Sequence, residues 1–208
     1  MMPLEDIYTF DWMQRVDAME RTSARVMTDT MFTGLRPSSA LDLGAGPCTH
    51  ANFLAGYGCK VTVVDGSICA ADFTDPGVRF IHADLTRPLD LQQTFDVVLC
   101  LEVIEHLPEE AETVLLETMV RHTAQWLVAT AASPGQKGRH HINLKPLSSW
   151  IEKIKDLGLI HESRLVAQWR ESWNAQNVLD YFINNLMIFS RTGNPKMETK
   201  IGGEFWRK

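Results

Sequence analysis

Apolar residues along the chain gather in short runs that end at glycine or acidic residues, and amphipathic stretches separate these runs. The runs that predict β-strands are 40–43, 60–64, 78–81, 95–101 and 126–131. The run at 95–101 is almost wholly apolar, which is typical of a central strand that is buried on both faces. Helical spacing of apolar residues predicts helices in the first 34 residues and near 48–57, 109–123 and 147–157.

Strands that alternate with helices indicate right-handed βαβ units. The sequence therefore predicts an α/β fold with a doubly wound, mostly parallel, Rossmann-like sheet of about seven strands. Two later strand-like runs, 159–166 and 182–190, predict an antiparallel edge strand on this sheet. We divide the chain into an N-terminal helical cap (1–34), a main domain (35–190) and a flexible C-terminal tail (191–208).

Composition and charge exclude several classes of protein. The 208 residues are 45% hydrophobic and 22% charged, which is enough for a buried core and unlike a disordered chain. Because no run reaches the ~18 apolar residues of a membrane span and the N-terminal segment is acidic, we expect a cytoplasmic protein without membrane contacts. A net charge of −6 makes nucleic acid an unexpected partner. The four cysteines show neither zinc nor disulfide spacing, so we expect reduced thiols.

Candidate ligand-binding residues follow the first three predicted strands, at the edge where parallel sheets bind their ligands. After the first strand, Gly44 and Gly46 allow a sharp turn and the close approach of a ligand to the backbone. The second strand ends at Asp65, about 20 residues later, where a carboxylate can bind a ribose diol. The third strand ends at Asp84. This order favours a nucleotide-type ligand.

Two nucleotide-type ligands fit this pattern to different degrees. A nicotinamide dinucleotide requires a third small residue where this sequence has Thr49, and it leaves Asp84 without a role. An adenine amine, by contrast, requires a hydrogen-bond acceptor such as Asp84. We therefore favour a ligand with an adenosine group over a nicotinamide cofactor.

Four segments carry a resemblance to a known family: LDLGAGPCTHANFL, VTVVDGS, FIHADLTRPL and FDVVLCLEVIEHLP. Together they resemble the successive motifs of class I S-adenosylmethionine-dependent methyltransferases, over residues 38–130. The resemblance implies S-adenosylmethionine as cofactor and makes 35–190 the methyltransferase domain. It also implies cofactor-binding roles for residues after each strand: Asp42, Gly44 and Gly46 at the methionine end, Asp65 at the ribose, Asp84 and Leu85 at the adenine, and Leu101 and Glu102 closing the pocket. Cys48 stands where many members have a third glycine.

A second pattern concerns Glu102, Glu105 and His106, which share one face if their segment forms a helical turn. With a later histidine they resemble the metal ligands of small-RNA 3′-terminal 2′-O-methyltransferases, although ubiquinone-pathway O-methyltransferases share the EVIEH-like residues. That likeness implies Mg²⁺ or Mn²⁺ bound by Glu102, Glu105, His106 and His141. In the alternative interpretation the segment is a turn whose carboxylates face the cofactor or bind backbone N–H groups. His106, His140 or His141 then remains a candidate general base.

These patterns predict O-methylation of a small-molecule or sugar hydroxyl, with His141 and His106 as catalytic residues. No N/D-P-P-Y/F motif follows the fourth strand, which disfavours methylation of an amide or adenine nitrogen. Two alternatives stay open: a metal-dependent 2′-O-methyltransferase acting on an RNA end, and an inactive cofactor-binding subunit. We expect the N-terminal helix and residues 133–145 and 167–180 to form the acceptor side. Trp169 and Trp173 either stack on a ring acceptor or pack against the N-terminal helix.

Overall fold

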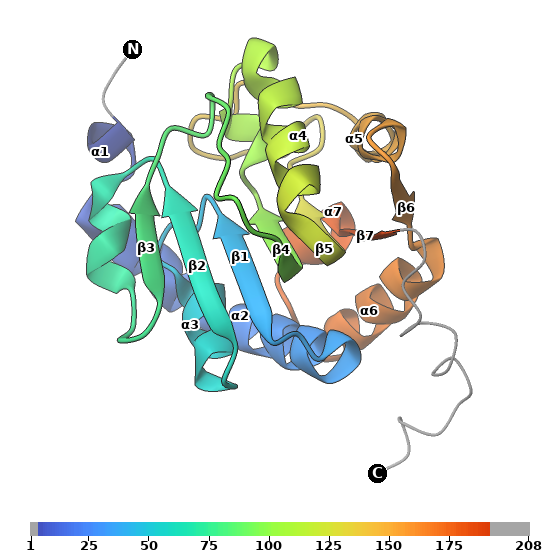
Figure 1. Ribbon diagram of the computed structural model, residues 1–208, viewed down its shortest axis with the longest axis horizontal. Coiled ribbons are helices and arrows are strands. Elements are labelled where there is room, and N and C mark those ends of the chain that lie inside the picture. Colours follow the sequence, from blue (N-terminus) through green and yellow to red (C-terminus); the bar gives the residue numbers. More distant parts are fainter. Residues whose placement is uncertain (1–3, 192–208) are drawn as a thin grey trace.

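The computed structural model describes residues 4–191, and its centre is a seven-stranded sheet with strand order β3-β2-β1-β4-β5-β7-β6 (Figure 1). The strands are β1 (Ser39–Leu43), β2 (Lys60–Asp65), β3 (Arg79–His82), β4 (Phe95–Leu101), β5 (Thr123–Thr130), β6 (Leu159–His161) and β7 (Met187–Arg191). The first five strands pair in parallel, whereas β7 runs antiparallel between β5 and the outermost β6. The predicted mostly parallel sheet with an antiparallel strand at its edge is therefore confirmed.

Helices cover both faces of the sheet. They are α1 (Leu4–Ile7), α2 (Phe10–Leu35), α3 (Thr49–Gly56), α4 (Glu112–His122), α5 (Leu147–Asp156), α6 (Ser163–Ala175) and α7 (Asp180–Asn185). Short 3₁₀ helices span Ile68–Phe73, Ile104–His106 and Glu109–Ala111. In Figure 1, α4 and α5 lie in front of the sheet and α2, α3 and α6 lie behind it.

Two hydrophobic clusters hold these layers together, and β4 contributes to both. Val97 and Leu99 belong to the cluster that α2, α3 and α6 complete. Val98 and Cys100 belong to the cluster under α4 and α5. The continuous apolar run of this strand thus reflects burial on both faces, as a central parallel strand requires.

The region after β6 differs from the sequence-based prediction. The predicted strand 159–166 ends at His161, and α6 begins at Ser163. The predicted strand 182–190 begins as α7, and only its second part forms β7. In α6, Val166, Trp169 and Trp173 recur at helical spacing and bury their side chains in the core. In α7, Phe182 and Ile183 bury theirs in the same cluster.

The two tryptophans of α6 pack against the N-terminal helix, which was one of the two predicted possibilities. The Trp173 side chain is fully buried, and its Nε1–H donates to Thr30 Oγ1 of α2 at 3.1 Å. The Trp169 ring lies beside Gly34, near the end of α2. These side chains are part of the core and are not a surface for stacking a ligand.

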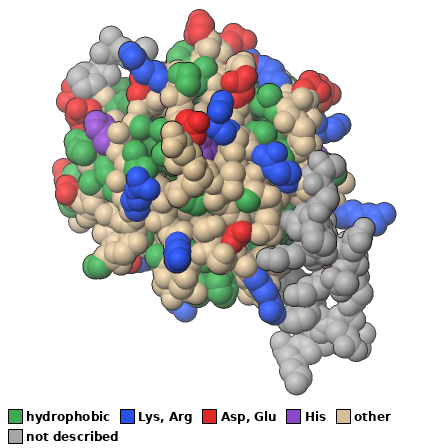
Figure 2. Space-filling view, in the orientation of Figure 1, with side chains coloured by type: hydrophobic (Ala, Val, Ile, Leu, Met, Phe, Trp, Pro, Cys, Tyr) green, Lys and Arg blue, Asp and Glu red, His purple; other side chains and the backbone are tan. Residues whose placement is uncertain are grey.

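The predicted boundaries of the cap, main domain and tail stay predictions. Helix α2 runs one residue past the predicted boundary at 34, and the predicted tail lies outside the described residues except for Arg191. Between residues 4 and 191, no helix combines the length and the apolar character needed to cross a bilayer. On the face shown in Figure 2, basic side chains are scattered among acidic and hydrophobic ones.

Candidate active site

A pocket of about 320 Å³ opens at the carboxyl ends of β1 and β4. Its walls come from the loop after β1, from α2, α3 and α7, and from residues 136–141. The predicted site residues that line it are Asp42, Gly44, Gly46, Leu101, Glu102, His106 and His141. The structure thus brings together residues that are up to 99 positions apart in the chain on one side of the sheet.

The loop after β1 turns the chain sharply into α3. Gly44, Gly46 and Cys48 have φ values of 73°, 51° and 55°, a backbone region that favours glycine. At Gly44 the turn is also crowded, because a Cβ would lie 2.6 Å from Cγ2 of Val103. Cys48 tolerates this conformation with its thiol buried near the carbonyl of Ala70.

Asp65 lies at the end of β2 and stabilises this loop by hydrogen bonding. Its Oδ2 accepts a hydrogen bond from Gly46 N–H at 2.8 Å, and its Oδ1 accepts one from Ser67 N–H at 2.7 Å. Burial raises the pKa of Asp65, and these two hydrogen bonds oppose that effect. The N-terminal segment covers the same region, since Ser67 Oγ donates to the Tyr8 carbonyl and Leu4 lies against Gly66.

Asp42, at the end of β1, faces the pocket from a buried position. Burial and the nearby Asp65 raise its pKa to about 7. Asp65, Asp84 and Leu85, in contrast, lie outside the pocket walls, so the ribose role of Asp65 stays a prediction. The Asp84 side chain is 51% exposed and accepts hydrogen bonds from Thr86, while Leu85 is buried in the core. The adenine role of these two residues stays a prediction.

Glu102 joins three segments of the chain. Its backbone is left-handed (φ 51°), and its two carboxylate oxygens accept hydrogen bonds from Gln136 at 2.7 Å and Asn185 at 3.0 Å. The same Asn185 amide also donates to Gln136 Oε1 at 2.8 Å, which closes a triangle of side chains. Glu102 therefore ties the 136–141 loop to α7, and it lies outside the group of possible metal ligands formed by Glu105, His106 and His141.

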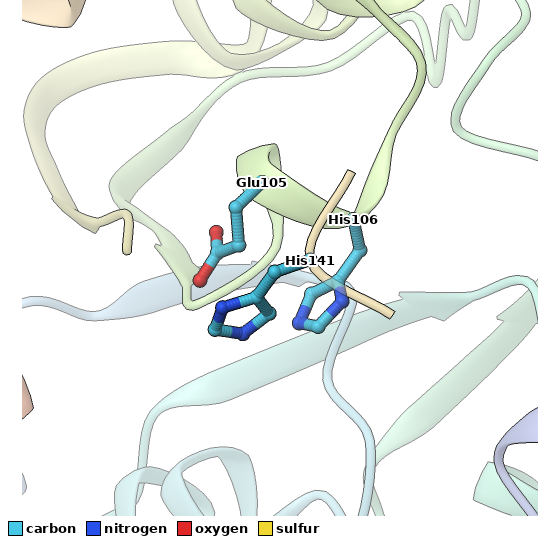
Figure 3. A group of neighbouring side chains, drawn as sticks. All are labelled: Glu105, His106 and His141. Carbon is cyan, nitrogen blue, oxygen red and sulfur yellow. The ribbon is translucent and has the colours of Figure 1, made fainter. Parts of the chain in front are cut away.

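Glu105, His106 and His141 converge on one point, as Figure 3 shows. Each offers a ligand atom that lies within 4.8 Å of the others. Glu105 is fully buried, and its Oε1 accepts a hydrogen bond from Ala132 N–H at 3.0 Å. Its Oε2 is also buried but has no hydrogen-bond partner among residues 4–191. The predicted helical turn forms only at Ile104–His106, so it presents Glu105 and His106 but not Glu102, whose backbone is left-handed. The alternative holds in part, because one Glu105 oxygen binds a backbone N–H.

The two histidines of this group are held so that one nitrogen of each has no hydrogen-bond partner among residues 4–191. His106 Nδ1 donates to the His140 carbonyl at 3.2 Å, and His141 Nδ1 donates to the Gln136 carbonyl at 3.3 Å. A neutral imidazole that donates from Nδ1 carries its lone pair on Nε2. The His140 side chain itself is exposed and lies outside the group.

Burial controls the charges of this group. It lowers the pKa of His106 to about 4, with His141 adding to the effect, so His106 is neutral at physiological pH. Burial, and then the Glu102 carboxylate, raise the pKa of Glu105. The backbone holds the loop in place, since Ile142 and Asn143 N–H both donate to the Glu105 carbonyl at 2.9 and 3.0 Å.

Sequence reasoning missed three residues that line the pocket: Glu20 of α2, His50 of α3 and Tyr181 of α7. A signal for Glu20 existed, because Trp12, Val16 and Glu20 follow one another at four-residue intervals on one helix face. A glutamate in an otherwise apolar stripe is unusual enough to mark a functional position. His50 lies within the LDLGAGPCTHANFL segment, but the resemblance gives it no role, and Tyr181 belongs to no quoted motif.

Comparison with solved structures shows which fold the chain shares. The fold matches a TehB-like S-adenosylmethionine-dependent methyltransferase from Corynebacterium glutamicum, with a TM-score of 0.60, 20% identity, and coverage of 82% of this chain and 87% of the other. It also matches the plantazolicin methyltransferase BpumL in complex with S-adenosylhomocysteine, with a TM-score of 0.62, 14% identity, and coverage of 91% and 90%. Both matches show a shared Rossmann-like methyltransferase fold.

Sequence comparison adds the family. Residues 40–125 match the family model described as "Methyltransferase domain". The ubiquinone biosynthesis O-methyltransferase of Rickettsia conorii is 26% identical over 198 residues, which are 89% of this chain and 61% of that protein. The family match, this relative and the solved structures together support a class I S-adenosylmethionine-dependent methyltransferase, as the motifs predict. It spans about three fifths of the length of this curated relative.

Proposed function

We propose that this protein transfers the methyl group of S-adenosylmethionine to a hydroxyl oxygen of a small molecule or sugar. The observation that carries the proposal is the convergence of Glu105, His106 and His141 at a pocket that the glycine loop also lines. Methyl transfer from a sulfonium is an in-line displacement, so the protein chiefly positions donor and acceptor. A hydroxyl acceptor must also lose its proton, and this group can receive it.

The cofactor site that we propose follows the strand ends. Asp42 and the loop at Gly44–Gly46 lie where the methionine part would bind, and Asp65 lies where the ribose would bind. Asp84 with Leu85 would frame the adenine, and Leu101 with Glu102 would close the pocket after β4. The buried carboxylates of Asp42 and Asp65 support this arrangement, because no lysine or arginine forms an ion pair with either within residues 4–191.

His141 is the best-placed proton acceptor. Its Nδ1–H is held by the Gln136 carbonyl, so the Nε2 lone pair is free to take the hydroxyl proton as the oxygen attacks. His106 is a poor base, because burial lowers its pKa to about 4. We assign to His106 the role of orienting the acceptor oxygen beside His141.

The same residues fit a divalent cation. The unpartnered Oε2 of Glu105 and the free Nε2 atoms of His106 and His141 are suitable donors for Mn²⁺ or Mg²⁺. Glu102 lies outside this group and would have to move toward it to become a fourth ligand. A bound cation would lower the pKa of the acceptor hydroxyl.

The test of this function uses chelator-stripped protein, S-adenosylmethionine and three acceptors: catechol, methyl glucoside and aniline. We expect methylated oxygen on catechol or the glucoside and no product from aniline, with mass spectrometry as the readout. Transfer that survives EDTA supports His141 as base, and transfer that requires Mn²⁺ supports the cation. Methylation of aniline alone, or no binding of S-adenosylhomocysteine, would contradict the proposal.

The cation has a separate test in Glu105→Gln. If Glu105 is a ligand, calorimetric titration with Mn²⁺ is expected to show at least tenfold weaker binding, because a neutral amide replaces the carboxylate. Glu110→Gln is the control, since Glu110 lies five residues away and is exposed. Equal Mn²⁺ affinity in wild type and Glu105→Gln would remove Glu105 from the ligand set.

Asp65→Ala tests the ribose assignment. We expect S-adenosylhomocysteine to bind 10- to 100-fold more weakly, which corresponds to about 1.5–3 kcal/mol of lost charge-assisted hydrogen bonds. The substitution also frees Gly46 N–H, which now donates to this carboxylate. Asp72→Asn, at an exposed position, is the control. Unchanged affinity in Asp65→Ala would disprove the assignment.

A further inference from the structure

Part of the pocket wall is built by α2, α3 and α7, and the chemistry proposed above does not use it. Glu20, His50, Tyr181 and Phe182 line this part of the pocket. Glu20 Oε1 accepts a hydrogen bond from the Tyr181 hydroxyl at 2.6 Å. Its Oε2 receives no hydrogen bond from any residue between 4 and 191. The carboxylate is thus fixed by one oxygen and open at the other.

His50 supplies an independent sign of a ligand on the same wall. It is 8% exposed, and its Nε2 is buried with no hydrogen-bond partner in the described part of the chain. Its ring meets the Phe182 ring edge-on, with 5.6 Å between centroids. Burial lowers the pKa of His50 to about 4, so it is neutral. A buried polar atom without a partner is costly unless a ligand or water satisfies it.

The charged groups on this wall are acidic only. The residues that α2, α3 and α7 contribute to the pocket include a carboxylate and aromatic rings, but neither lysine nor arginine. The cations that line the pocket, Lys137 and Arg139, come from the 136–141 loop. Burial, reinforced by Glu102 and Asp17, raises the pKa of Glu20 to about 7. Burial of a charged carboxylate costs free energy, and a cationic ligand group that pairs with Glu20 would offset that cost.

We propose that Glu20 recognises the methyl acceptor by binding a protonated amine that the acceptor carries beside its reacting hydroxyl. Tyr181 fixes the Glu20 carboxylate, and the aromatic rings on this wall provide faces that favour an ammonium group. The acceptor class is then a hydroxylated amine, such as a catecholamine or an amino sugar. This inference rests on the proposed function, because it concerns the same pocket and the same transfer.

The cofactor carries an ammonium group of its own, which defines the main competing explanation. The predicted methionine end borders Asp42 and the glycine loop, whereas Glu20 lies on α2. If Glu20 bound the cofactor ammonium instead, its replacement would weaken the binding of S-adenosylhomocysteine. The experiment therefore measures cofactor affinity and acceptor affinity separately.

The acceptor probes are dopamine, 4-methylcatechol and 3,4-dihydroxybenzoate, which share a catechol and differ in the charge of the side group. Each is titrated calorimetrically, in EDTA, into the S-adenosylhomocysteine complex of wild type, Glu20→Gln and Glu171→Gln. Glutamine keeps the acceptor for the Tyr181 hydroxyl, and Glu171 is an exposed carboxylate of α6. We expect wild type and Glu171→Gln to bind dopamine at least tenfold more tightly than 4-methylcatechol, and the anionic benzoate most weakly.

In Glu20→Gln we expect dopamine and 4-methylcatechol to bind within about twofold of each other, with unchanged affinity for S-adenosylhomocysteine. The inference is overturned if wild type does not prefer the amine, if the preference survives in Glu20→Gln, or if that variant loses cofactor affinity. Because the readout is binding, it is independent of turnover. A preference for dopamine without methylation of any catechol would instead count against the proposed function.

Discussion

Replacement of His141 by alanine is expected to lower methyl transfer at least 100-fold and to leave the affinity for S-adenosylhomocysteine within about twofold. General base catalysis contributes roughly 10²–10⁴-fold, and His141 holds a free Nε2 in the group with Glu105 and His106. The measurement pairs steady-state transfer to the best hydroxyl acceptor with calorimetric titration of the cofactor product. His140→Ala is the matched control, because that side chain is exposed and lies outside the group.

A second variant displaces the His141 ring without deleting it. A Cβ at Gly138 would lie 2.0 Å from His141 Nε2, so Gly138→Ala must push the imidazole away. We expect a loss of transfer in the same direction as in His141→Ala, again with cofactor affinity kept. If transfer and cofactor affinity fall together in both variants, His141 supports the structure of the loop and is not the proton acceptor.

Gly44→Ala is expected to lower the free energy of unfolding by about 3 kcal/mol and to abolish measurable cofactor binding. Two costs add: alanine is strained by roughly 1–2 kcal/mol at a φ of +73°, and overpacking in a core costs about 1–3 kcal/mol. The overpacking arises because the new Cβ would lie 2.6 Å and 2.8 Å from the two methyl groups of Val103. Chemical denaturation and calorimetric titration measure the two effects.

Two controls separate the backbone cost from the clash. Gly58 has a φ of +89° with open space around a Cβ, so Gly58→Ala is expected to cost only about 1 kcal/mol. In a Val103→Ala background the two methyl contacts are gone and only the close contact with the Val103 Cβ, at 3.3 Å, remains, so Gly44→Ala is expected to show a clearly smaller further cost. A full 3 kcal/mol loss in that background would show that Val103 is not the obstacle.

The sheet was predictable because the apolar residues in the sequence of each strand match the side chains that the fold buries. The apolar run at 95–101 reflects the placement of β4 between two cores, and the glycines after β1 reflect positive φ values. Helix α6 was missed, although Val166, Trp169 and Trp173 recur at helical spacing. The strand-like prediction for 159–166 masked its start, and the helix from Ser163 is fixed by the burial of Trp169 and Trp173 against distant residues of α2.

The candidate site was predictable only where motifs mark it. The EVIEH segment placed Glu105 and His106 beside each other, and the loop histidine His141 joins them in the structure. Glu20, His50 and Tyr181 escaped notice, since each is a single residue on a helix and their proximity arises only from tertiary packing. The hydrogen bonds of Glu102 could not be predicted from the sequence either, because their partners lie 34 and 83 residues away.

The triangle of Glu102, Gln136 and Asn185 has an evolutionary consequence. Each member satisfies the other two, and Asn185 is only 1% exposed, so loss of one side chain leaves buried polar atoms without partners. Substitution at one position alone is therefore selected against, and the three positions are expected to vary as a set among related sequences.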